Sequence, residues 1–235
     1  MKTILTLILC LGITAARAQN TLTADQVIDT YLTAIGGKAA IAKVKDMSMD
    51  MAAETERGTM LSEFKMKAPD KFVSVMFAMG SEVRRVTGNG GRVSTTQGFG
   101  GNNQTQLSDG AKAQGELMQN HPFPELFYDS LGVQRVLLGK EPINGAEANK
   151  VEFSLGDRKW IEHFDVASGL KVKRSATVET PRGKMDIAQS YSDYKAVEGV
   201  KIPYVREMGG RFAMKMEVQS VKINKGIKDK EFEIK

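Results

Sequence analysis

The sequence lacks the residues from which common metal and disulfide sites are built. It has one cysteine and two histidines, so zinc ribbons, disulfide frameworks and multi-histidine sites have no ligands to draw on. No G-x-S-x-G nucleophile elbow occurs, and the glycine-rich stretch 98–101 has no Lys-Ser/Thr pair after it, so it is not a P-loop. We therefore expect no catalysis, no metal and no cofactor.

The overall composition is that of an ordinary globular chain. Hydrophobic residues make up 41%, charged residues 26%, and the mean hydropathy is -0.28, which excludes a disordered, collagen-like or multispanning protein. The net charge of +5 is mild, and Lys and Arg alternate with apolar residues as on a solvated sheet face. We therefore expect no nucleic-acid partner. A weak attraction to anionic lipid headgroups, and so a peripheral membrane contact, stays open.

The first residues have the pattern of a secretory signal peptide. Lys2 precedes an apolar run over 4–13, and Ala16-Arg17-Ala18 ends it with small residues two apart. The run is too short to span a bilayer comfortably, and no later stretch is longer. We predict cleavage after Ala18, which leaves residues 19–235 as the mature chain.

Two other interpretations of this segment exist. One is a buried N-terminal helix. The other is lipid attachment at Cys10, but a lipobox needs a small residue before the cysteine, and Leu9 stands there inside the apolar run. If Cys10 is removed with the signal, the mature chain has no cysteine and can fold in an oxidising compartment.

The mature chain is predicted to open with a helix. Thr23 and Gln26 have the spacing of a capping box, and apolar residues then recur at helical spacing up to Ile35. Gly36-Gly37 is expected to end the helix, and a shorter helical turn to follow before Val44.

From Asp46 the period of the apolar residues changes to two, which is typical of strands. Short strands separated by turn residues then recur through most of the chain. Their even spacing predicts one antiparallel meander of about ten to twelve strands, with no βαβ alternation. We expect a mainly β, α+β fold in a single domain, 19–235. The expected strands are 46–52, 59–66, 72–77, 83–87, one through Val93, 133–138, 150–155, 159–164, 170–178, 185–194, 200–206 and 212–223.

Two segments interrupt the strands. Residues 97–110 are rich in Gly, Asn, Gln and Ser and are predicted to form a flexible polar loop. Residues 111–129 are predicted to be helical in two pieces, separated by Pro122 and Pro124, with a heavily apolar side. The helical segment could form a lid with the loop as its hinge, or it could be docked permanently on the sheet.

The order of these elements resembles the LolA/LolB superfamily of lipoprotein carriers of the Gram-negative envelope, and more closely their outer membrane lipoprotein-sorting relatives. Each of the matching motifs is a turn or a strand end, and their order carries the resemblance. They are Tyr31–Gly37, Lys67–Phe72, Leu138–Gly145, Ser168-Gly169-Leu170, Tyr191–Tyr194, Gly199–Pro203 and the closing Ile223-Asn224, Asp229 and Phe232.

The resemblance implies a half-open, curved antiparallel barrel around a hydrophobic cavity, with helices as a lid, in the periplasm. In the carriers the cavity takes acyl chains, and an arginine between Lys and Pro of one strand turn latches the lid. Here Ala68 occupies that place. The resemblance therefore implies a carrier or binder of a lipid, of an acylated protein or of another apolar molecule, without that latch.

The residues themselves also argue for a cavity. Methionine is unbranched and polarizable and adapts to ligands of variable shape, and several methionines lie on strand faces. The alternative is that these methionines simply fill a core. The residues predicted to line the cavity or the lid are Met47, Met49, Met51, Phe64, Met66, Phe77, Leu117, Phe123, Leu126, Phe127, Trp160, Met214 and Met216.

Two other functions remain as alternatives. One is an interaction module that pairs with an envelope protein through an edge strand or a convex face, and that has no ligand pocket. The other is a hydrolase, which would need carboxylates or a histidine in a cleft. Against the hydrolase, Asp157, Glu162 and Asp165 are expected to be solvated, and neither His121 nor His163 has a second histidine at ligand spacing.

Overall fold

Thirteen strands form one antiparallel sheet in the computed structural model, which describes residues 22–234 except 57, 100–101, 181–182 and 210–212. The predicted signal peptide lies outside the described residues. The strands are β1 (Asp46–Thr55), β2 (Gly58–Lys67), β3 (Lys71–Ala78), β4 (Ser81–Asn89), β5 (Arg92–Phe99), β6 (Asn102–Ser108), β7 (Gln134–Ile143), β8 (Ala146–Leu155), β9 (Arg158–Asp165), β10 (Lys171–Thr180), β11 (Gly183–Val197), β12 (Val200–Met208) and β13 (Met214–Ile223).

The sheet is open and consists of two meanders joined at its centre. Its order is β6-β5-β4-β3-β2-β1-β13-β12-β11-β10-β9-β8-β7, so β6 and β7 stand at opposite edges. The join is the pairing of β1 with β13, in which Met47 lies opposite Ile223 and Met49 opposite Val221. The expected half-open barrel is therefore an open sheet, and it has one strand more than the upper expectation.

The polar segment 97–110 is the source of the extra strand, and its prediction as a loop was wrong. Residues up to Phe99 continue β5, and Asn102–Ser108 form β6, in which Thr96 and Thr105 share a hydrogen bond of 2.9 Å between their hydroxyls. Residues 102–107 are all exposed. An edge strand in water on both faces has no buried side to impose an apolar alternation, so its sequence reads as a loop.

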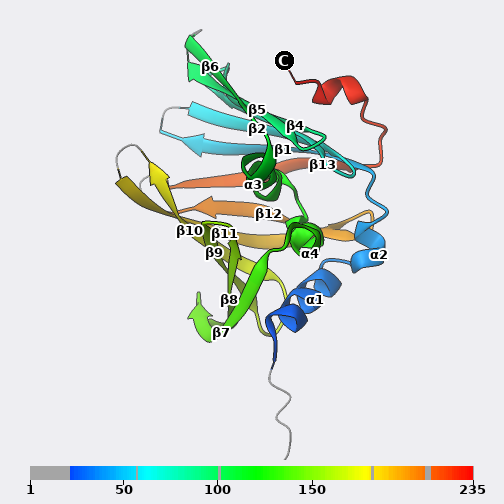
Figure 1. Cartoon of the computed structure of the whole chain (residues 1–235), viewed down its shortest axis with the longest axis vertical. Coiled ribbons are helices and arrows are strands. Elements are labelled where there is room, and N and C mark those ends of the chain that lie inside the picture. Colours follow the sequence, from blue (N-terminus) through cyan, green and yellow to red (C-terminus); the bar gives the residue numbers. More distant parts are fainter. Residues whose placement is uncertain (1–21, 57, 100–101, 181–182, 210–212, 235) are drawn as a thin grey trace, which may run out of the picture.

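The helices that precede β1 and those between β6 and β7 cover one face of the sheet, as the arrangement in Figure 1 shows. The predicted N-terminal helix is confirmed as α1 (Ala24–Ala34) with the Thr23–Gln26 capping box, and the shorter helical turn as α2 (Lys38–Ile41). The segment predicted as two helical pieces forms three, namely α3 (Gly110–Asn120), the 3-10 helix η1 (Pro124–Phe127) and α4 (Tyr128–Leu131). None of the described helices is long and apolar enough to cross a membrane.

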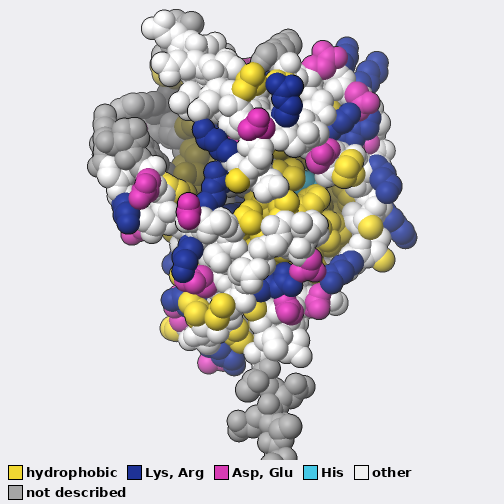
Figure 2. All heavy atoms as spheres, in the orientation of Figure 1, with side chains coloured by type: hydrophobic (Ala, Val, Ile, Leu, Met, Phe, Trp, Pro, Cys, Tyr) yellow, Lys and Arg dark blue, Asp and Glu magenta, His cyan; other side chains and the backbone are white. Residues whose placement is uncertain are grey.

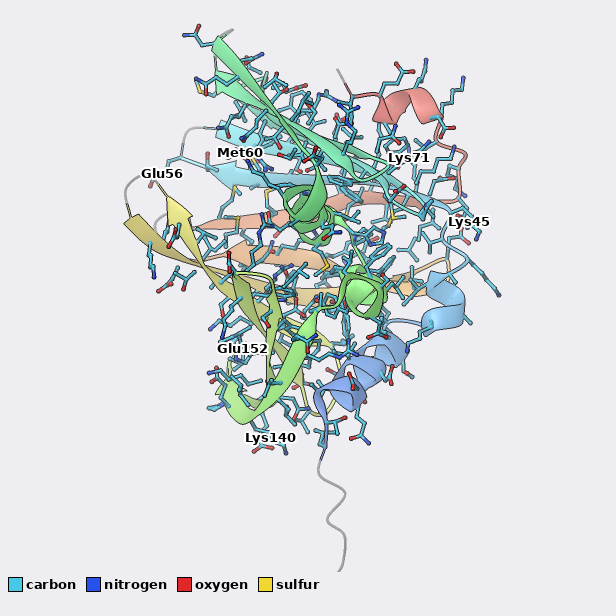
Figure 3. The ribbon with its side chains drawn as sticks, viewed as in Figure 1. Lys45, Glu56, Met60, Lys71, Lys140 and Glu152 are labelled. Carbon is cyan, nitrogen blue, oxygen red and sulfur yellow. The ribbon has the colours of Figure 1, made fainter. Side chains whose placement is uncertain are left out.

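The main core lies between these helices and the inner face of the sheet. Met47, Phe153 and Phe164 are at most 1% exposed, and Ile35 and Tyr128 reach them from the helical side. In Figure 3, Lys45 and Lys71 mark the end of the sheet nearer α2, and Glu56 and Met60 mark the opposite end, over which no described helix lies. The helices therefore cover the end of the inner face near α2 and leave the opposite end uncovered by any described helix.

A smaller core lies on the outer face of β3. Phe232 of the C-terminal 3-10 helix η3 (Asp229–Phe232) packs against Val73 and Val75, and Phe77 packs beside them. Lys65 Nζ donates to Glu231 Oε2 at 2.9 Å and holds the same segment. Side chains alternate across a strand, so this cluster stands on the face opposite to Phe72 and the main core.

The turn after α1 brings helix and sheet into close contact. Gly36 has φ +125°, and a Cβ there would lie 2.3 Å from the carbonyl oxygen of Gly199. Lys201 N donates to Ile35 O at 2.8 Å next to it. Only glycine fits this approach, and the turn fixes α1 to the β11–β12 hairpin.

We expect Gly36→Ala to lower the free energy of unfolding by about 2 kcal/mol or more, because it adds a steric clash to an unfavourable φ. Gly37→Ala is the matched control, since Gly37 also has positive φ but no atom within 4 Å of a built Cβ. Urea unfolding of both variants measures the difference. Equal losses would show that the approach to Gly199 is not restrictive.

Candidate functional site

A cavity of about 140 Å³ lies between the inner face of the sheet and the segment that joins α3 to η1. Its lining comes from β1, β2, β3, β10, β11 and β12 on the sheet side and from residues 119–124 on the helical side. Figure 2 shows hydrophobic side chains gathered over the middle of this face, with charged side chains around them. The cavity is about the size of one that holds a benzene ring.

One side of the cavity is apolar. Met49 and Met51 of β1 and Phe64 of β2 line it from the sheet, and Phe123 lines it from the segment above. Met49 and Phe64 stand directly opposite each other in the β1–β2 register, so their side chains share the inner face. These four residues are the members of the sequence-predicted set that line the cavity.

The other members of that set lie elsewhere. Met47, Met66, Trp160 and Met216 are buried in the main core, and Leu117 and Met214 pack against it. Phe77 belongs to the cluster on the outer face, and Leu126 is 38% exposed. The ring of Phe127 stands edge-on to His121, with 4.8 Å between the centroids. The methionines thus include both cavity-lining and core-filling residues.

The other side of the cavity is polar and cationic, which the sequence did not predict. Lys171 and Arg174 of β10, Arg206 of β12 and Tyr191 and Tyr194 of β11 line it. The expectation that the basic residues of the strands all lie on a solvated face is therefore wrong for these three. Alternation along a strand shows that two faces differ, but not which face a charged residue occupies.

A buried ion-pair network stands beside the cavity. Lys171 Nζ contacts Glu125 Oε1 and lies 3.4 Å from Glu162 Oε1, and Arg174 Nε lies 3.8 Å from the same Glu162 oxygen. Glu162 is fully buried, so its expected place in solvent was wrong; the two cations compensate its charge. Tyr194 also donates from its hydroxyl to the Lys171 carbonyl at 2.8 Å.

Burial and the neighbouring charges shift the pKa values of residues in this network. Burial alone would lower the pKa of Lys171, but the attraction of Glu125 and Glu162 outweighs burial and raises that pKa. Burial raises the pKa of Glu125, and Lys171 acts in the opposite direction. Burial likewise raises the pKa of the Tyr31 hydroxyl, whose ring centroid is 5.2 Å from Lys171 Nζ. Lys171 therefore carries a positive charge at neutral pH.

The same network ties the helical cover to the sheet. Glu125 belongs to η1, whereas Lys171 and Glu162 belong to β10 and β9. The contact joins residues 46 apart in the chain. We call residues 121–131 the cover segment. It is attached to the sheet by a buried charge pair, and Phe123 and Tyr128 anchor it in the core.

His121 begins the cover segment and is buried without a charge partner. Its Nδ1 accepts a hydrogen bond of 3.0 Å from the backbone N–H of Phe123, so that nitrogen is unprotonated. Burial lowers the pKa of His121 to about 4. This histidine turns the chain at the end of α3 and is neutral at physiological pH.

The described residues do not offer a metal site, because no three His, Cys, Asp or Glu side chains among them gather at ligand spacing. The carboxylates of Glu125 and Glu162, in the network beside the cavity, both contact Lys171. The cavity can therefore accommodate a small apolar group on one side and hydrogen-bond acceptors on the other.

Two solved structures share this architecture over nearly all of the chain. A LolA superfamily protein from Nitrosomonas europaea is 12% identical with a TM-score of 0.60, covering 91% of this chain and 99% of that one. A domain described as that of an outer membrane lipoprotein-sorting protein, from Vibrio parahaemolyticus, is 12% identical with a TM-score of 0.53, covering 83% and 93%. No protein family model and no curated protein matches the chain in sequence. The fold is LolA-like, as the resemblance predicted.

We expect acid to weaken the folded protein through His121. The unfolded chain binds a proton at His121 below pH 6.5, and the folded chain only near pH 4, so stability falls as the pH drops through this window. By pH 4.5 the loss is about 2 kcal/mol relative to pH 7.

The test compares wild type with His121→Asn, whose Oδ1 can accept the same backbone hydrogen bond but does not titrate. Urea unfolding at pH 7 and pH 4.5 gives the two differences in stability. The variant should lose less on acidification than the wild type. Parallel losses would show that burial of His121 does not govern the acid response.

Proposed function

We propose that the protein is a periplasmic, non-catalytic binder of a lipid, an acylated protein or another apolar molecule, held between the sheet and the cover segment. The observation that carries this proposal is the cavity at that place, with Met49, Met51 and Phe64 on its sheet side. The LolA-like fold supports it. We further propose that residues 1–18 direct export and are removed, and that residues 19–235 act as one domain.

The size of the cavity sets a condition on the proposal. A volume of about 140 Å³ holds a ring-sized group and not a whole acyl chain. A longer ligand must therefore extend out of the cavity or displace the cover segment. Displacement is feasible because η1 and α4 have four residues each, and short helical pieces depend on their tertiary contacts.

The buried pair of Glu125 and Lys171 would control that displacement. Opening separates the two charges, and water or Glu162 must then replace the lost contact of Lys171. In this proposal the pair latches the cover segment. An arginine at the place of Ala68 latches the lid in the carriers that the sequence resembles. Binding needs no proton transfer, so the network has a structural role.

A protein partner is the second candidate function. Val136 and Leu138 of the edge strand β7 are 55% and 49% exposed, and no described strand covers the free edge of β7. Unpaired edges of this kind can accept an additional strand. This candidate requires no cavity, so the cavity-filling experiment below distinguishes the two.

We expect a bulky residue in the cavity to block an apolar ligand. Ser74 of β3 lines the cavity opposite Phe64 in the β2–β3 register, so Ser74→Trp fills the space. Ser192→Trp is the control, because Ser192 is exposed on β11. Dodecanol affinity, measured by calorimetry, should fall about tenfold or more in the first variant only, since its methylenes lose their burial.

Native mass spectrometry of wild type purified from the periplasm should also show a bound apolar molecule. If wild type does not bind dodecanol, or if both tryptophan variants bind it as wild type does, ligand binding in the cavity is rejected. A co-purifying protein whose binding is unchanged in Ser74→Trp would favour the second candidate.

We expect Glu125→Gln to loosen the cover segment. The change removes one charge of the pair with Lys171, and backbone amides of 121–131 should exchange hydrogen about tenfold faster. Glu147→Gln is the control, because the Glu147–Lys140 pair of 3.2 Å is exposed on β7 and β8. Equal exchange in both variants would mean that the buried pair does not hold the segment.

A further inference from the structure

The cationic side of the cavity contains one partly buried charge that no described residue neutralises. Four cations line the cavity. Lys201 is exposed to solvent, whereas Lys171, Arg174 and Arg206 are buried or partly buried. Two carboxylates, Glu125 and Glu162, lie in the network beside the cavity. Glu125 pairs with Lys171, and Glu162 pairs with both Lys171 and Arg174. Arg206 forms no ion pair with any described residue.

The guanidinium of Arg206 is also short of hydrogen-bond acceptors. Its Nε is buried and lacks a partner within the described part of the chain, and its Nη2 reaches the sulfur of Met49 at 3.7 Å. A thioether sulfur is a weak acceptor. An arginine is charged in proteins, so burial without an anion is unfavourable unless something else supplies the acceptor.

The groups around Arg206 cannot supply that anion. The ionisable groups that act on it are the hydroxyls of Tyr31, Tyr191 and Tyr194, and none of these is a carboxylate. Tyr191 stands directly opposite Arg206 on β11, and its hydroxyl donates to Gln189. On the other neighbouring strand the residue opposite is the buried Met216. No described group therefore compensates the charge of Arg206, and an anionic ligand could do so.

The position of Arg206 relates this charge to the apolar side of the cavity. Arg206 Nη2 lies 3.7 Å from the sulfur of Met49, and Met51 and Phe64 line the same cavity. The volume of about 140 Å³ admits a compact head group. A molecule with an apolar chain and a small anionic end is complementary to both sides at once.

We propose that Arg206 binds the anionic end, a carboxylate or a phosphate monoester, of an acyl-chain ligand whose first methylenes lie against Met49 and Phe64. The inference rests on the proposed function, because it assumes that the cavity takes an apolar molecule. The planar guanidinium presents a fork of N–H donors that matches either oxyanion. Arg206 then selects charged amphiphiles over neutral ones of equal chain length.

The test titrates the full-length exported protein with dodecanoate, dodecyl phosphate and dodecanol below their micelle concentrations. Wild type should bind the two anions about tenfold or more tightly than dodecanol, as charge-assisted hydrogen bonds predict. The tighter of the two anions identifies the head group. Arg206→Met should lose this preference while retaining the affinity for dodecanol, and Arg206→Lys should retain part of it.

Lys222→Met is the matched control, because Lys222 is exposed on β13 and is not one of the residues that line the cavity. It should keep the preference for anions. The melting temperature of ligand-free Arg206→Met should equal or exceed that of wild type, since the change removes a partly buried charge that has no ion-pair partner among the described residues. A lower melting temperature with weaker dodecanol binding would instead assign Arg206 a structural role and overturn the inference.

The outcomes separate the inference from the proposed function. If wild type binds dodecanol and the anions equally, the apolar cavity stands and the anion site is rejected. If wild type binds none of the three probes, the proposed function itself is rejected, and the inference with it.

Discussion

The contact on which the covered cavity depends is the buried charge pair of Lys171 and Glu125. An open antiparallel sheet must cover one face, and here short helical pieces provide much of the cover. Such pieces have little stability of their own. A buried charge left without its partner is strongly unfavourable, so the pair requires Glu125 of η1 to lie at Lys171 of β10 whenever the cover is closed. The cavity lies beneath the segment that this pair positions.

The pairing pattern explains why the cavity has two unlike sides. Glu162 pairs with both Lys171 and Arg174, and Glu125 pairs with Lys171, so the network is confined to η1, β9 and β10. Arg206 lies on β12 and takes no part in these ion pairs. Toward β1 and β2 the lining changes to methionine and phenylalanine. The lining of the cavity therefore changes from cationic at β10 and β12 to apolar at β1 and β2. This change supports the inference of an amphiphilic ligand.

Much of the fold could be predicted from the sequence, and the reasons are local. The capping box of Thr23 and Gln26, the glycines that end α1 and the turn at Gly90-Gly91 determine their surroundings within a few residues. The edge strand β6 was not predicted, because a strand with water on both faces shows no alternation of apolar and polar residues. The polar side of the cavity escaped because it depends on which face Lys171, Arg174 and Arg206 occupy, and three-dimensional pairing decides that.

The placement of β13 has a consequence for how the chain reaches its structure. This last strand pairs with β1, the first, and completes the middle of the sheet, while Asn224 donates its backbone N–H to Asp46 O at 2.9 Å beside them. Every other neighbouring pair of strands follows directly in sequence. Two independent meanders can thus form early, but they join only once β13 has been synthesised. Until then each half presents a bare edge at what will become the molecule's centre, where premature association with other chains is most harmful.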